Sequence, residues 1–111
     1  MPAEKYAYKP VNTVRSFGEV LAHAADGMNW YCGSAKAGKD VQWSDAVEKA
    51  GGAKAQVVAA LKKATADCSA TYGASTPPQF GKLMGNVAHL NLHYGNLITY
   101  MRMMGLKPPS S

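Results

Sequence analysis

Residues 80–101, FGKLMGNVAHLNLHYGNLITYM, are the stretch from which the fold of this chain can be argued. Large apolar side chains recur in it every three or four residues, which is the spacing of one face of an α-helix. Thr76 is a suitable N-cap and Pro77 a favourable first helical residue. Gly105, with two prolines shortly after it, is a typical residue just past a helix end. The sequence therefore predicts one long helix over residues 77–104.

This predicted helix carries two of the three histidines of the chain, His89 and His93. Residues four apart lie on the same helix face, so the two imidazoles can share one metal ion. Two ligands do not complete a site, and His23 is the only other histidine. At about 100° per residue, the pair lies on a flank of the apolar arc rather than at its centre. The same flank carries three polar residues, Asn86, Asn96 and Tyr100.

A second amphipathic helix is predicted over residues 14–33. Ser16 and Glu19 have the spacing of a capping box, in which each side chain accepts a hydrogen bond from the backbone of the other residue. Apolar residues then repeat at helical spacing up to Gly33. His23 lies off this apolar stripe, near Asp26, so both histidine-bearing helices present their histidines at the edge of a helix–helix contact.

The middle of the chain predicts a third helical region over residues 44–72, with a break near 51–52. Gly51 and Gly52 supply the break, because each glycine costs roughly 1 kcal/mol relative to alanine inside a helix. Residues 1–12 show no helical period and are expected to form an extended lead-in. The chain of 111 residues is thus predicted to be a single all-α domain, 1–111, with about three main helices.

Charge and cysteine content narrow the functional classes. The formal net charge is +5, from 12 basic and 7 acidic residues. The basic residues are scattered, which favours a solvated surface over nucleic-acid binding. No run approaches the ~20 apolar residues of a membrane-spanning helix, so we expect no membrane association. Cys32 and Cys68 are too few for a disulfide framework, and we expect them to be reduced thiols of a cytoplasmic protein.

The histidine pattern alone leaves two interpretations open, a three-histidine metal site and three partly exposed histidines. A zinc-protease motif is excluded, because HExxH requires glutamate after the first histidine and Leu90 stands there. The sequence also contains no CxxCH motif for covalent haem attachment.

Three segments taken together resemble the DinB superfamily: RSFGEVLAHAAD at 15–26, HLNLHYGNLITYMR at 89–102 and GLKPPSS at 105–111. The resemblance covers most of the chain, strongly at both ends and weakly from Gly33 to Gln79. Members of this superfamily are up-down four-helix bundles. They hold a divalent metal with three histidines, one from the second helix and two from an HxxxH motif on the fourth.

The resemblance implies that His23, His89 and His93 are the metal ligands and that the metal is Zn or Ni. Groups that could orient the ligand rings from outside are expected to be Asp26, Asn86, Asn96 and Tyr100. The superfamily's first helix has no counterpart here. A bundle without it exposes an apolar face, so we expect a homodimer or a higher oligomer in which a second copy covers that face.

Characterised relatives in the superfamily include transferases and isomerases that use low-molecular-weight thiols. The resemblance therefore implies a metal-dependent thiol S-transferase or isomerase acting on a small-molecule thiol. The alternative is a non-catalytic metal-binding or structural helical homo-oligomer. No residue can be named as catalytic from the sequence.

Overall fold

The computed structural model describes residues 1–109, and within them all regular secondary structure is helical, as predicted. Ser110 and Ser111, the end of the GLKPPSS segment, lie outside the described residues. None of the described helices is both long enough and apolar enough to span a membrane. In chain order the elements are η1 (Ala3–Lys5), α1 (Phe17–Ala37), α2 (Ala46–Lys49), α3 (Lys54–Gly73), η2 (Pro77–Gln79) and α4 (Phe80–Met103).

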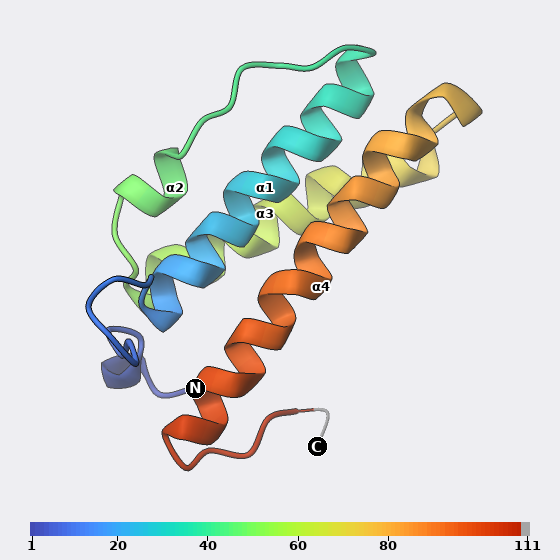
Figure 1. Cartoon of the computed structure of the whole chain (residues 1–111). Coiled ribbons are helices and arrows are strands. Elements are labelled where there is room, and N and C mark those ends of the chain that lie inside the picture. Colours follow the sequence, from blue (N-terminus) through green and yellow to red (C-terminus); the bar gives the residue numbers. More distant parts are fainter. Residues whose placement is uncertain (110–111) are drawn as a thin grey trace.

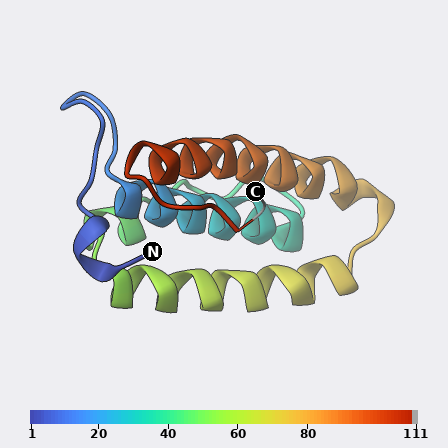
Figure 2. The ribbon, with the colours of Figure 1, turned by 90° about the horizontal axis from the view of Figure 1, so that it is seen from below.

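Helix α1 is the centre of the fold, because both other long helices pack against it (Figures 1 and 2). In Figure 2, α4 lies on one side of α1 and α3 on the other, and α3 and α4 touch each other only marginally. Helix α4 runs antiparallel to α1. Helix α3 runs in the same direction as α1, because the segment 38–53 returns along the molecule before α3 begins (Figure 1). The expected up-down alternation therefore fails between α1 and α3, which are parallel, and holds between α3 and α4, which are antiparallel.

The start of α1 is the predicted capping box. The backbone N–H of Glu19 donates to Oγ of Ser16 (3.2 Å), and the N–H of Ser16 donates to Oε2 of Glu19 (2.8 Å). The helix begins at Phe17 rather than at residue 14, and it continues past Gly33 to Ala37. It ends at Gly38, whose φ of 74° is left-handed. Packing of the buried residues around Gly33 outweighs that glycine's helix penalty of about 1 kcal/mol.

The predicted break near 51–52 is present and separates the single turn α2 from α3. Gly51 has a φ of 105°, a conformation that L side chains rarely adopt. Gly52 lies directly against the first turn of α1, where a side chain at Gly18 would overlap the Gly52 carbonyl group. The lead-in is less extended than expected, because residues 3–5 form the 3₁₀ turn η1.

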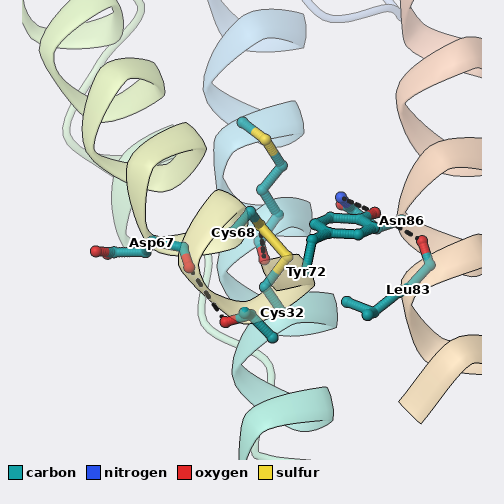
Figure 3. Close-up of a disulfide and its surroundings, with 8 residues drawn as sticks. Cys32, Asp67, Cys68, Tyr72, Leu83 and Asn86 are labelled. Atoms are coloured by element: carbon teal, nitrogen blue, oxygen red, sulfur yellow. Dashed lines mark hydrogen bonds between the residues drawn. A yellow bond between two sulfur atoms is a disulfide. The ribbon is translucent and has the colours of Figure 1, made fainter. Parts of the chain in front are cut away.

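Cys32 of α1 and Cys68 of α3 form a disulfide, with their Cα atoms 5.3 Å apart (Figure 3). The prediction of reduced thiols was therefore wrong. The two cysteines are 36 residues apart in sequence, but the parallel course of α1 and α3 brings them to facing turns. Small buried residues such as Ala64 allow this close approach.

Only part of the predicted apolar arc of α4 is buried. Leu83 belongs to one buried hydrophobic cluster, and Leu90 packs against that cluster. Leu97 packs against a second cluster, which includes Phe17 and Val57. Phe80, Met84 and Val87 are exposed, and Leu92 on another side of the helix is exposed too. The reason is the position of α3, which packs on the opposite side of α1 from α4. Helix α3 therefore does not cover the outer half of the apolar arc of α4. Beyond the helix, Gly105 adopts the predicted left-handed conformation with φ of 75°.

Candidate metal centre

The three histidines converge where α1 crosses the middle of α4. Nε2 of His89 lies 3.2 Å from Nε2 of His23 and 3.1 Å from Nε2 of His93. Donor atoms of the three residues all lie within 4.8 Å of one another. Tetrahedral coordination with Zn–N distances of about 2.0–2.1 Å requires neighbouring nitrogens to be about 3.3 Å apart. Both distances from His89 are close to this value, and the three residues together could hold one metal ion.

Local structure explains why the three rings meet. His89 and His93 are one turn apart on α4, and the capping box fixes where α1 begins. Gly27, one turn after His23 on α1, leaves room for the imidazole of His89. A β-carbon at Gly27 would overlap that ring. The meeting of the rings thus depends on a glycine as well as on the histidines.

Burial and neighbouring positive charge lower the pKa values of the His89 and His93 imidazoles. The pKa of His93 is lowered to about 4, chiefly by burial and then by the positive charges that His89, His23 and Arg15 can carry; Glu48 acts in the opposite direction. The pKa of His89 is lowered by burial, and after that by His23 and Arg15. A metal ion binds the neutral imidazole, so these two rings have a ligating lone pair available at neutral pH.

The Nδ1 atoms of the three histidines differ in their surroundings. Nδ1 of His23 lies 3.4 Å from Oε1 of Glu48, and Nδ1 of His93 lies 3.4 Å from the side-chain nitrogen of Asn96. Rotating the Asn96 amide by 180° would present its oxygen, which can accept from an Nδ1–H group. Nδ1 of His89 is buried and has no hydrogen-bond partner within residues 1–109.

Of the four residues expected to support the ligands, the hydrogen bonds place only Asn96 beside a histidine. The Asp26 carboxylate accepts from backbone N–H groups of α2. Asn86 donates to the hydroxyl of Tyr72 (3.2 Å), and Tyr100 donates to the carbonyl of Arg15 (2.9 Å). Glu48 was not anticipated, because the sequence gives no register between the short helix α2 and α1.

An open cavity of about 680 Å³ lies beside the cluster. Its volume is in the range of small-molecule sites. His93 reaches it from α4, and Tyr100 contributes from the same helix. The remaining polar lining residues include Arg15, Glu19, Glu48 and Asn96. A small molecule in this cavity would meet His93 of the cluster together with positive and negative side chains.

Comparison of the chain with protein-family models, with curated proteins and with solved structures gives no match. The convergence of the three histidines is therefore the main structural observation that bears on function.

Proposed function

We propose that this chain is a divalent-metal-binding protein of the DinB kind, with His23, His89 and His93 as ligands. The supporting observation is that Nε2 of His89 lies 3.2 Å from Nε2 of His23 and 3.1 Å from Nε2 of His93, and that ligand atoms of all three residues lie within 4.8 Å of one another. Three neutral nitrogen ligands without a fourth protein ligand are typical of catalytic zinc sites, where an open position accepts water or substrate. We propose Zn or Ni as the metal, because both accept imidazole ligands.

We further propose a metal-dependent thiol S-transferase or isomerase activity, which follows from the resemblance to DinB proteins. A bound ion would lower the pKa of a thiol or polarise a carbonyl group. The contribution of the chain is to orient the substrate in the cavity beside His93. Arg15 can attract an anionic group there, and Asn96 can form a hydrogen bond to a polar one.

The disulfide changes the proposed compartment. The cytoplasm was expected because both cysteines were taken as reduced. Since Cys32 and Cys68 are joined, an oxidising compartment is favoured instead. Both cysteines are buried, and both also line an open cavity of about 560 Å³ between α1 and α3.

The second candidate function is a non-catalytic homo-oligomer, and the exposed part of α4 favours it. Phe80 is 48% exposed, Met84 72% and Val87 51%, and all three lie on one side of the helix. A second copy covering this side would bury them. Light scattering after size exclusion tests the assembly, and a single species of 11.8 kDa at high protein concentration would contradict it.

The test of metal binding is elemental analysis of the purified chain, before and after incubation with Zn²⁺ followed by removal of free ion. We expect one ion per chain, lost in His89→Ala with helical content unchanged. Asn91→Ala is the matched control, because Asn91 is exposed on the same helix. A wild-type chain that retains no metal would contradict the proposal. Thiol-transfer assays with a panel of electrophiles then separate the enzyme from the non-catalytic alternative.

A further inference from the structure

The single turn α2 is fixed against α1 by a buried carboxylate. Asp26 is only 2% exposed, and its two oxygens accept from the backbone N–H groups of Val47 (3.1 Å) and Glu48 (3.0 Å). A carboxylate is favourable at a helix start, where backbone N–H groups lack partners within the helix. Asp26 therefore determines where α2 begins and how its residues face α1.

One residue of α2, Glu48, consequently reaches the histidine cluster. Its Oε1 lies 3.4 Å from Nδ1 of His23, and its Oε2 accepts from Nε of Arg15 at 2.6 Å. The Glu48 side chain is 22% exposed and that of His23 16%, so the pair is mostly shielded from water. The arginine holds one carboxylate oxygen and leaves the other facing the imidazole.

The ring of His23 requires such a group. Its Nδ1 is buried, and within the described part of the chain no hydrogen bond of good geometry satisfies it. An unsatisfied buried polar group costs about 1–3 kcal/mol. The Glu48 oxygen is the acceptor beside this atom, and a small rotation of either side chain shortens the contact to hydrogen-bond length. The opposite nitrogen, Nε2, faces His89.

We infer that Glu48 is a positioning residue for the metal site, holding the proton of His23 on Nδ1 so that the Nε2 lone pair faces the ion. This inference rests on the metal-binding function proposed above. A metal-bound histidine commonly donates its other ring N–H to a carboxylate, which fixes the tautomer and increases the basicity of the ligand. Asp26 acts indirectly, because its hydrogen bonds to α2 place Glu48 beside His23.

The competing explanation is that Glu48 only forms an ion pair with Arg15 on the surface. Such a pair contributes about 0–1 kcal/mol to stability and nothing to the metal site. The two explanations differ in metal affinity and in the spectrum of a bound ion, neither of which a surface ion pair would change.

The test compares Glu48→Ala and Glu48→Gln with the wild type and with Glu4→Ala, a matched control at an exposed position in η1. The dissociation constant for Zn²⁺ is measured by competition with a chromophoric chelator, and the visible absorption of bound Co²⁺ reports ligand geometry. We expect Glu48→Ala to weaken Zn²⁺ binding about 10–100-fold and to alter the Co²⁺ bands. Glu48→Gln, which keeps an acceptor oxygen, should recover part of the affinity.

Affinity and Co²⁺ bands of Glu48→Ala equal to those of wild type and Glu4→Ala would overturn the positioning role while leaving the metal site intact. A wild-type chain that binds neither ion would instead overturn the proposed function and this role with it. Circular dichroism of the metal-free proteins checks the fold. If Glu48→Ala loses helix, the comparison of Glu48→Met with wild type decides, because methionine has a similar length and no strong acceptor oxygen. Equal Zn²⁺ affinity and Co²⁺ bands in those two would then overturn the role.

Discussion

The two sides of α1 are built differently. Toward α3 it presents small and sulfur-containing residues, and Cys32 is covalently joined to Cys68 (Figure 3). Toward α4 it presents His23 and Gly27 beneath the ring of His89. Three buried side-chain atoms lack hydrogen-bond partners within residues 1–109, Nδ1 of His23, Nδ1 of His89 and Oδ1 of Asn86, and all belong to α1 or α4.

This difference suggests a division between the parts of the chain that stabilise the fold and the part that carries the proposed metal site. Each orphaned polar group costs about 1–3 kcal/mol, so the α1–α4 contact is less stable than an apolar contact of the same size. The Nε2 atoms of the three histidines also meet at this contact. We therefore interpret the α1–α3 contact as the stable scaffold and the α1–α4 contact as the part that carries the proposed metal site.

The largest effect is predicted for removal of the disulfide that joins α1 to α3. The double variant Cys32→Ala/Cys68→Ala opens a covalent loop spanning 36 residues. Loop-closure entropy predicts a loss of about 4 kcal/mol in the free energy of unfolding, measured by urea denaturation. Under native conditions, Zn²⁺ affinity should stay within about threefold of wild type, because the histidines lie on the other side of α1. A parallel collapse of affinity in a still-folded variant would show that the two contacts are not independent.

A smaller effect is predicted for the α1–α4 contact. Gly27→Ala puts a methyl group where the His89 ring now lies. The ring can move away, so the fold should persist, and alanine favours the helix by about 1 kcal/mol. Displacing one ligand should weaken Zn²⁺ binding by about tenfold or more, that is, by at least about 1.4 kcal/mol, measured by chelator competition.

Gly33→Ala is the matched control, because Gly33 lies in the same helix and its β-carbon would meet only Val41, at 3.9 Å. It should stabilise the chain by about 0.5–1 kcal/mol and leave Zn²⁺ affinity unchanged. Equal Zn²⁺ affinity in the two variants would contradict the role of Gly27.

These contrasts also show which features the sequence could predict. The capping box at Ser16 and the pairing of His89 with His93 are local, since one helical turn determines both. The meeting of His23 with that pair depends on how α1 and α4 pack, and it was expected from the resemblance rather than from helix geometry. The break at Gly51 was predictable because its cause, glycine backbone freedom, needs no partner.

What could not be predicted depends on register between distant segments. The Cys32–Cys68 disulfide requires α3 to run parallel to α1, and no local pattern indicates that direction. Glu48 reaches His23 because Asp26 fixes α2, a contact 22 residues apart in sequence. The apolar arc of α4 was read correctly as helical, but periodicity cannot show how much of an arc a neighbour covers.

The smallest predicted effect concerns two hydrogen bonds that join α3 to α4. The Tyr72 hydroxyl of α3 donates to the Leu83 carbonyl (2.9 Å) and accepts from the Asn86 side chain (3.2 Å), as Figure 3 shows. Tyr72→Phe removes both bonds and leaves the nearly fully buried Asn86 amide without this partner. We expect a loss of about 1 kcal/mol in urea denaturation.

A double-mutant cycle with Asn86→Leu tests whether the loss of stability in Tyr72→Phe arises from the unpaired Asn86 amide. Once Asn86 is replaced by an apolar residue of similar size, Tyr72→Phe should cost less than it does in the wild type, because no buried amide is then stranded. Zn²⁺ affinity should not change in Tyr72→Phe, since neither bond involves a histidine. Strict additivity of the two substitutions would mean that the α3–α4 tie contributes nothing through Asn86.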